Sequence, residues 1–242
     1  MTLMLPFVLI LAAMDAKTQV ALEKDVISTS AGPAEITFVG HGSLMISFQD
    51  KIIHIDPYSK MTDYAVLPKA DLILITHEHG DHLDVKLLPQ IRKANTEIVY
   101  TQKCSSSYPG GIVMHNGETR SFGKIKIEAV PAYNLVNRRD ATQVYHPKGE
   151  GNGYILTMGD KRIYIAGDTE NTPEMKALKN IDVAFLPMNL PYTMTPEMVA
   201  DAVKAFRPKI LYPYHYGDTD TQKLVDLLKT DKDTEIRIRK MH

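Results

Sequence analysis

The feature that most restricts the fold of this chain is an apolar run that passes directly into a loop rich in histidine. The run, Leu72–Ile75, is typical of a strand that is buried on both faces. The next seven residues read THEHGDH, and Gly80 allows their backbone to turn tightly. Because a buried strand holds the loop that leaves it, we expect these side chains to converge. Three of the nine histidines fall within six residues here, which argues against a solvated loop that is rich in histidine by chance.

Composition limits the chemistry that such a loop can support. The single cysteine, Cys104, rules out a disulfide framework, a Cys₄ zinc site and a CxxC redox motif. The candidate ligands are therefore imidazole and carboxylate groups, which suit zinc and also manganese or iron(II). The net charge of −1 gives the whole chain no pull on nucleic acid, so we expect no nucleic-acid partner. Hydrophobic residues at 44% and charged residues at 24% are typical of a soluble globular protein.

The N-terminus predicts a secretory signal. The eleven residues Leu3–Ala13 carry no charge and are too short to span a bilayer, which takes about 20 apolar residues, but they match the core of a signal peptide. We expect a signal peptide over residues 1–16, a polar lead-in without strand period over 17–33 and one folded domain over 34–242. The expected location is periplasmic or secreted, without a stable membrane anchor. The alternatives are a buried N-terminal segment or a mis-set start codon, in a cytoplasmic protein.

Short β-type runs follow one another from about Glu35 onward. Turn residues predict two hairpins, one at Gln49-Asp50 and one at Gly159-Asp160. The runs that we expect as strands are Ile36–Val39, Leu44–Phe48, Ile52–Ile55, Leu72–Ile75, Ile98–Tyr100, Ile125–Val130, Tyr154–Met158, Ile163–Ala166, Val183–Leu186, Ile210–Tyr212 and Ile236–Ile238.

Helical patterns are fewer and lie between or after these strands. Thr195-Pro196 opens a helix that Pro208 ends, because threonine caps a helix and proline fits its first turn. A second helix begins at about Thr221, and a weaker one follows Asp84. Early hairpins followed by strands that alternate with helices predict a mixed α/β sandwich, in which two sheets are covered by helices.

The His-x-His-x-Asp-His string resembles the signature of the metallo-β-lactamase superfamily. The resemblance runs from about Glu35 to the C-terminus and implies the αββα fold, two mixed β-sheets flanked by helices. It also implies a bridging aspartate and a last histidine after later strands, and Asp168 and His215 follow in that order. Three segments are similar to those of the branch that contains L-ascorbate-6-phosphate lactonase and many uncharacterised metal-dependent hydrolases: VGHG at 39–42, IDP at 55–57 and PYHY at 213–216.

The resemblance fails at one expected ligand. The family places a further histidine between the first motif and the bridging aspartate, often at the end of a strand, where this chain has Asn134. Of the two histidines in the interval, His115 reads as part of a surface turn. His146 lies in a glycine-bearing loop, and we expect it to be the missing ligand or a catalytic group that faces the substrate. The alternative for His146 is an ordinary loop residue in contact with solvent.

The resemblance implies two divalent metal ions, zinc most readily and manganese or iron as alternatives. Two such ions lower the pKa of a shared water, so that a hydroxide nucleophile exists at neutral pH. Asp81 is expected to ligate and also to pass a proton to the leaving group. The implied ligand sets are His77, His79 and His146 for one ion, Asp81, His82 and His215 for the other, with Asp168 between them.

Four other residues are expected beside the ligands or facing the substrate. His41 and Asp56 follow strands, and a carboxylate such as Asp56 can fix the tautomer of a ligand histidine. Asn134 begins a long polar segment of 134–153 with a net charge of +1, a hint of an anionic small-molecule substrate. Tyr192 lies in a second candidate wall of the pocket. His54 and His242 are expected to lie outside the site, and the sequence leaves the oligomeric state open.

The function implied is a dinuclear metal-dependent hydrolase that acts on a small ester, lactone, amide or phosphoester. One alternative is an iron-dependent oxidoreductase on the same fold, although no cysteine-rich segment is present to pass electrons. The other is a catalytically silent member that binds a metal or a ligand, which the departure at Asn134 keeps open.

Overall fold

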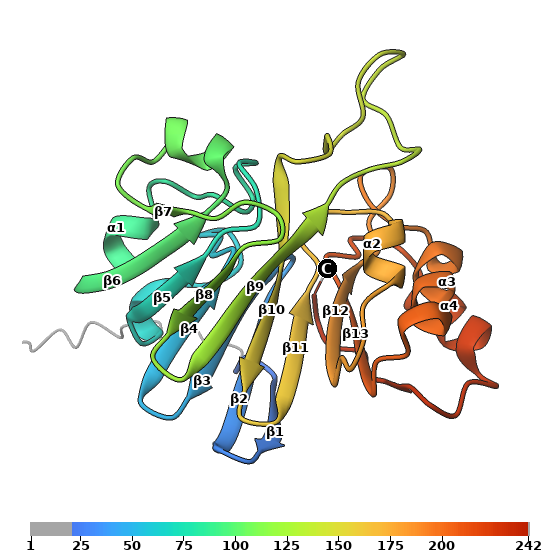
Figure 1. Ribbon diagram of the computed structural model, residues 1–242, viewed down its shortest axis with the longest axis horizontal. Coiled ribbons are helices and arrows are strands. Elements are labelled where there is room, and N and C mark those ends of the chain that lie inside the picture. The colour runs from blue at the N-terminus through green and yellow to red at the C-terminus, as the bar shows by residue number, and fades with distance from the viewer. Residues whose placement is uncertain (1–20, 242) are drawn as a thin grey trace, which may run out of the picture.

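Two seven-stranded β-sheets pack face to face in the computed structural model, which describes residues 21–241 (Figure 1). The first sheet contains, in order, β1 (Lys24–Thr29), β2 (Gly32–Gly40), β3 (Ser43–Phe48), β4 (Lys51–Ile55), β5 (Ala70–Leu74), β6 (Arg92–Tyr100) and β7 (Ile112–Val113). The second contains β8 (Thr119–Phe122), β9 (Ile125–Ala132), β10 (Gly151–Met158), β11 (Lys161–Ile165), β12 (Val183–Pro187), β13 (Ile210–Tyr214) and β14 (Glu235–Ile236).

Both sheets are mixed in the same way. Strands β1 to β4 and β8 to β11 pair antiparallel, whereas β4 to β7 and β11 to β14 pair parallel. The two predicted hairpins form, since Phe48 pairs with Lys51 and Met158 pairs with Lys161. As a result, seven strands end at one edge of the sandwich: β2, β4, β5, β9, β11, β12 and β13.

The helices lie on the outer sides of the sheets, with α1 (Leu88–Ile91) beside the first and α2 (Pro173–Lys176), α3 (Pro196–Phe206) and α4 (Thr221–Leu228) along the second (Figure 1). Short 3₁₀ turns span Tyr64–Val66 and Gln102–Ser106. Thr195 caps α3 as predicted, because its side chain accepts a hydrogen bond from the backbone N–H of Met198. The prediction of two sheets covered by helices is therefore confirmed.

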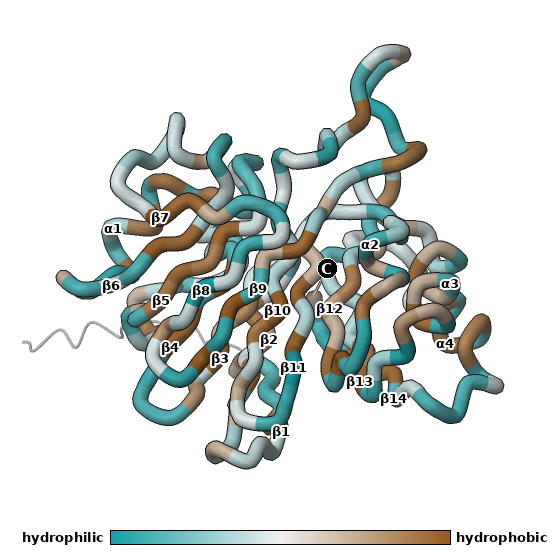
Figure 2. Tube along the Cα trace, viewed as in Figure 1, coloured by the Kyte–Doolittle hydropathy of each residue, from teal (hydrophilic) through white to brown (hydrophobic). Residues whose placement is uncertain are grey.

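The apolar run that constrained the fold is buried on both faces, as expected. In β5, Leu72 and Leu74 belong to the core between the sheets, whereas Ile73 and Ala70 belong to a smaller core on the outer side with the α1 residues Leu88 and Ile91. Figure 2 shows hydrophobic residues concentrated along the strands and hydrophilic residues in the turns that connect them. The strand is thus packed on two sides, and it holds the loop that follows it rigidly.

One domain boundary was wrong. The lead-in predicted over 17–33 contains strand β1, and β2 already begins at Gly32. The local pattern did not reveal β1, because Ile27 is its only buried residue. Its stability comes from pairing with β2 and from the ion pair between Asp25 and Arg239, which lies far away in the sequence. The strands β7 and β8 and the helix α2 were also missed.

The predicted signal peptide and His242 lie outside the described residues. Within residues 21–241, the helices are all too short or too polar to cross a membrane.

Candidate metal centre

The side chains predicted for the site gather at the edge where the strands named above end. The long segment between β9 and β10 projects from the same edge (Figure 1). Hydrogen bonds, ion-pair distances and the lining of one cavity connect eleven residues there: His41, Asp56, His77, His79, Asp81, His82, Asn134, His146, Asp168, Tyr192 and His215.

Asp56 organises the half of the site that belongs to the first sheet. It follows β4 and is fully buried, and its two oxygens accept hydrogen bonds from the backbone N–H and the hydroxyl of Thr76 at 2.8 and 2.7 Å. Asp56 Oδ2 also lies 2.8 Å from His82 Nδ1, which places the proton of that ring on Nδ1. The Nε2 atom of His82 is therefore the one left to bind a proton or a metal ion.

Thr76 extends this network to the first histidine of the motif. Its hydroxyl donates to Asp56, so it can only accept from His77 Nδ1, which lies 3.1 Å away. His77 Nε2 then faces His79 Nδ1 at 3.0 Å. His77 Nε2 accepts this hydrogen bond, and a cation bound between the two nitrogens would take the place of the proton that they share.

Asp168 lies between two groups of histidines. Its Oδ1 atom is 3.5 Å from His82 Nε2 and 3.6 Å from His215 Nε2. Its Oδ2 atom is 3.4 Å from His146 Nε2 and 4.0 Å from His77 Nε2. Each oxygen of one carboxylate thus faces a different cluster, which is the placement that a bridging ligand needs.

His146 and Asn134 occupy different positions relative to the cluster. The ring of His146 is buried beside His77 and His79, and the three ligand atoms lie within 4.8 Å of one another. Asn134 holds the His146 ring in place, because the Oδ1 atom of Asn134 accepts hydrogen bonds from the backbone N–H and the Nδ1 of His146 at 2.8 and 2.7 Å. Asn134 therefore sets the tautomer and leaves His146 Nε2 free toward Asp168.

Glu170 fixes Asn134 in turn. This carboxylate is fully buried and accepts hydrogen bonds from the backbone N–H groups of Leu135, Val136 and Asn137 at 2.8, 2.9 and 2.6 Å. The Nδ2 atom of Asn134 also lies within 3.2 Å of Glu170 Oε1. No local pattern in the sequence indicates this role, because the donors are more than thirty residues from the acceptor.

The second cluster contains Asp81, His82, His215 and His41. His41 Nε2 lies 2.9 Å from Asp81 Oδ2, and its ring centroid lies 3.7 Å from that of His215. The backbone N–H of His215 donates to the carbonyl of His41, which joins the ends of β2 and β13 across the two sheets. His41 thus contacts the cluster directly, as expected for a residue beside the ligands.

Four buried atoms of this site have no hydrogen-bond partner among residues 21–241: His82 Nε2, His146 Nε2, His215 Nε2 and Asp168 Oδ1. Buried polar atoms without partners destabilise a fold by about 1–3 kcal/mol each, so they call for an explanation. All four face inward on the two clusters. Three nitrogens and one carboxylate oxygen without partners at these two clusters fit divalent cations.

The electrostatics of the site agree with that fit. Burial opposes a charge on His82, but the carboxylates of Asp168, Asp56 and Asp81 outweigh it and raise the pKa of His82 to about 10. The volume at Nε2 is therefore strongly favourable to positive charge. Burial lowers the pKa of His146 to about 4, so that this ring is neutral and able to bind a metal at neutral pH.

Two glycines allow the close packing, and sequence reasoning gave them no role. A Cβ atom on Gly42 would lie 2.9 Å from His82 Cε1. A Cβ atom on Gly167 would lie 2.9 Å from Thr76 Cβ, and the positive φ of this residue, 65°, also favours glycine. A larger residue at either position would displace a ligand or the threonine that orients it.

A cavity of about 540 Å³ opens beside the clusters. Its lining includes His41, Asp81, Asp168 and His215, together with Arg139, Tyr145, Asn189 and Tyr192. Tyr192 thus forms part of the wall, as expected. His54 lies outside, buried in β4 with its Nε2 2.9 Å from the carbonyl of Pro68, and His115 is exposed.

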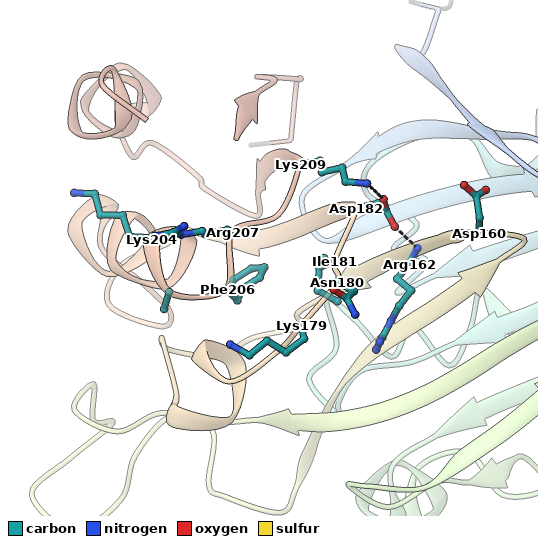
Figure 3. Close-up of a pocket in the computed structure, with 11 residues that line it drawn as sticks. Asp160, Arg162, Lys179, Asn180, Ile181, Asp182, Lys204, Phe206, Arg207 and Lys209 are labelled. Carbon is teal, nitrogen blue, oxygen red and sulfur yellow. Dashed lines mark hydrogen bonds and ion pairs between the residues drawn. The ribbon is translucent and has the colours of Figure 1, made fainter. Parts of the chain in front are cut away.

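A larger hollow of about 650 Å³ lies at the opposite ends of β12 and β13 (Figure 3). It is rich in cationic side chains, and no histidine or cysteine lines it. Asp182 is already bound there by Lys209 Nζ at 2.7 Å and by the backbone N–H of Arg162 at 2.9 Å (Figure 3). The His/Asp clusters lie at the other edge.

Fold and site together define a protein of the metallo-β-lactamase class, with two mixed sheets and a His/Asp cluster at one edge. A family model described as a beta-lactamase superfamily domain matches residues 35–215. The UPF0173 metal-dependent hydrolase YtkL of Bacillus subtilis (strain 168) is 35% identical over 200 residues, which cover 76% of this chain and 86% of that protein. A UPF0173 metal-dependent hydrolase of Pelotomaculum thermopropionicum is 32% identical over 193 residues, covering 76% and 84%.

Solved structures agree. A crystal structure of a candidate metal-dependent hydrolase from Parabacteroides distasonis superposes with a TM-score of 0.87 at 50% identity and covers 92% of this chain and 100% of that one. YhfI from Bacillus subtilis, with a TM-score of 0.68 at 15% identity over 84% and 89% of the two chains, shows the fold alone. The chain belongs to the metallo-β-lactamase superfamily and, within it, to the UPF0173 metal-dependent hydrolases. The similarity to the L-ascorbate-6-phosphate lactonase branch stays a prediction.

Proposed function

We propose that this protein is a dinuclear metal-dependent hydrolase that acts on a small ester, lactone, amide or phosphoester. The observation that supports the proposal most is the position of Asp168, whose two oxygens face two separate clusters of histidine nitrogens. A site for a single ion would need only one of these clusters. The names of the UPF0173 relatives support the hydrolase class.

In this proposal, one ion is held by His77, His79 and His146 and the other by Asp81, His82 and His215, with Asp168 shared. Zinc suits a set of nitrogen and oxygen ligands best, with manganese and iron as alternatives. Two bound ions would supply a water of lowered pKa and polarise the acyl or phosphoryl oxygen of the substrate.

The chain's own groups position the reactants and handle the proton. Asp56 and Asn134 hold His82 and His146 in the tautomers that leave Nε2 free. Asp81 lines the cavity, and its Oδ2 is the atom proposed to take a proton from the water and pass it to the leaving group. Hydrolysis then breaks the bond between the acyl or phosphoryl group and its leaving oxygen or nitrogen, and water completes both products.

The test combines metal analysis with a substrate panel. Protein purified with zinc or with manganese is expected to bind two ions per chain and to hydrolyse at least one of a lactone, a phosphodiester, a β-lactam and an acyl ester. Asp168→Ala is expected to lose metal while its unfolding transition remains cooperative. A stoichiometry of one or less in fully loaded wild-type protein would contradict the dinuclear site.

The same samples separate the alternatives. An iron-specific absorption band in protein from cells, together with oxygen consumption, would favour the oxidoreductase. Two bound ions without turnover of any substrate would favour the catalytically silent member.

Secretion of the protein stays a proposal that rests on the N-terminal apolar run. We expect the mature protein in the periplasm or medium to begin near residue 17, which mass spectrometry of its N-terminal peptide measures. An intact Met1 on protein from the cytoplasm would contradict this.

A further inference from the structure

The part of the cavity lining that lies outside the two His/Asp clusters differs from them in character. Arg139 and Tyr145 come from the segment that projects between β9 and β10, and Tyr192 comes from the loop between β12 and α3. We propose that these three residues select a substrate that carries an anionic group beside an apolar ring. The inference rests on the proposed hydrolase function, because it names the substrate class of that site.

Arg139 provides the positive charge. Among the described residues that line the cavity, it is the only lysine or arginine. Its guanidinium makes no hydrogen bond or ion pair within residues 21–241, although the backbone N–H of Arg139 is tied to the carbonyl of Gln143 at 2.8 Å. The backbone is thus held while the charged group is left free for a ligand.

The neighbouring carboxylate does not neutralise this charge by direct contact. Asp140 Oδ1 accepts hydrogen bonds from the backbone N–H groups of Thr142 and Gln143 at 2.8 and 2.9 Å and from the Thr142 hydroxyl at 2.7 Å. Asp140 therefore closes the tip of the projecting segment. An anionic group of a ligand is the partner that Arg139 lacks.

Two tyrosines provide the apolar wall. The rings of Tyr145 and Tyr192 meet edge to face, with centroids 5.0 Å apart and an interplanar angle of 75°. Tyr192 remains 44% exposed, so part of its ring is open to a ligand. Aromatic rings favour other rings in this geometry, with a gain beyond simple burial.

The two loops form one unit. Asn134 Nδ2 donates to the carbonyl of Tyr192 at 2.9 Å, and Asn137 Nδ2 donates to the carbonyl of Thr193 at 2.6 Å. The exposed apolar side chains of Leu135, Val136 and Leu190 lie on the same loops. The loops that carry Arg139, Tyr145 and Tyr192 are therefore fixed to each other beside the cavity.

Binding of inert probes tests the inference on metal-loaded full-length protein. Calorimetry compares 4-phenylbutyrate, which has a ring and a carboxylate, with 4-phenylbutanol and butyrate, which each lack one of the two. We expect 4-phenylbutyrate to bind about tenfold more tightly than either. Arg139→Gln should weaken 4-phenylbutyrate about tenfold and leave 4-phenylbutanol unchanged.

Matched variants separate these contacts from general damage. Arg138→Gln removes an exposed cation from the same segment that does not line the cavity, and it should change none of the three affinities. Tyr192→Ala should weaken both ring compounds but not butyrate, and Tyr192→Phe should restore them. Equal effects of Arg139→Gln and Arg138→Gln, or equal binding of all three probes by wild type, would overturn the proposal.

Turnover distinguishes this inference from the proposed function. The hemisuccinate ester of 4-nitrophenol should be hydrolysed in preference to the neutral butyrate ester of the same phenol, and Arg139→Gln should remove that preference. If wild type binds 4-phenylbutyrate through Arg139 but hydrolyses no substrate, the hydrolase function fails and the ligand class stands. If Tyr192→Ala instead dissociates an oligomer without changing probe affinity, the surface around Tyr192 is a contact between copies and the proposal is wrong.

Discussion

Replacement of Asn134 by alanine tests whether metal binding depends on the hydrogen bonds by which Asn134 orients His146. Asn134 Oδ1 accepts two hydrogen bonds from His146, one from the backbone N–H and one from Nδ1. Without this acceptor, nothing holds the proton of the ring on Nδ1. The ring can then turn or place its proton on Nε2, the atom that faces Asp168.

The structure sets the size of the effect. Two neutral hydrogen bonds contribute roughly 0.5–1.5 kcal/mol each, or about 1–3 kcal/mol together. If all of this energy orients the ligand, metal affinity falls by about 5- to 150-fold. The loss of a group that orients a ligand histidine typically weakens metal binding by about 10–100-fold, which lies within the same range.

The measurement is a competition titration of zinc against a chelator, read for each of the two expected ions. We expect the ion at His146 to weaken and the other to change little. Asn137→Ala is the control, because it removes a hydrogen bond of the same loop, to the carbonyl of Thr193, without touching His146. If His146→Ala weakens binding while Asn134→Ala leaves it unchanged, the positioning role of Asn134 is refuted. If neither variant weakens binding, His146 is not a ligand.

Three further changes test other parts of the argument. Gly42→Ala places a Cβ atom 2.9 Å from Cε1 of His82, whose buried ring is held by Asp56, so it should weaken the ion bound by His82 in the same titration and also lower the midpoint of urea unfolding of the apoprotein. Asp56→Asn puts an amide donor opposite His82 Nδ1 and should move the ring proton to Nε2, with about 10–100-fold weaker metal binding in the same titration. Asp25→Asn concerns stability: burial opposes ionisation of Asp25, but the hydrogen bond and charge of Arg239 outweigh it and hold the pKa of Asp25 below its usual value. Because the folded pKa is the lower one, this stabilisation is present at neutral pH and is lost as the pH falls below about 4; Asp25→Asn should lower the urea midpoint at pH 7 and lose less on acidification than wild type.

The part of the site that the sequence predicts is the part built from local spacing. His77, His79, Asp81 and His82 lie on one loop after one buried strand, so their convergence follows from the chain itself. Asp168 and His215 could be placed only through the resemblance, because their strands lie in the other sheet and no local pattern joins them to the loop.

The choice between Asn134 and His146 could not be made from the sequence, and the reason is physical. Both residues lie on a long segment whose path is set by Glu170, a buried acceptor for three consecutive backbone N–H groups of that segment. No local sequence pattern identifies a glutamate two residues after Asp168 as the acceptor of these hydrogen bonds. The role of Thr76 also could not be predicted, because the hydrogen bond from its hydroxyl to Asp56 depends on the pairing of β4 with β5.

The two hydrogen-bond networks that orient the histidines lie in different sheets, and Asp168 faces the histidines of both. In the first sheet, Asp56 and Thr76 fix His77 and His82; in the second, Glu170 and Asn134 fix His146. Each network ends in an imidazole nitrogen that has no protein partner, and each such buried atom destabilises the fold by about 1–3 kcal/mol. The networks make these unpaired atoms more rigid, so they cannot relieve the penalty by turning to find partners. Divalent cations bound to these atoms would remove the penalty, and this is the physical basis for regarding the edge of the sandwich as a metal centre.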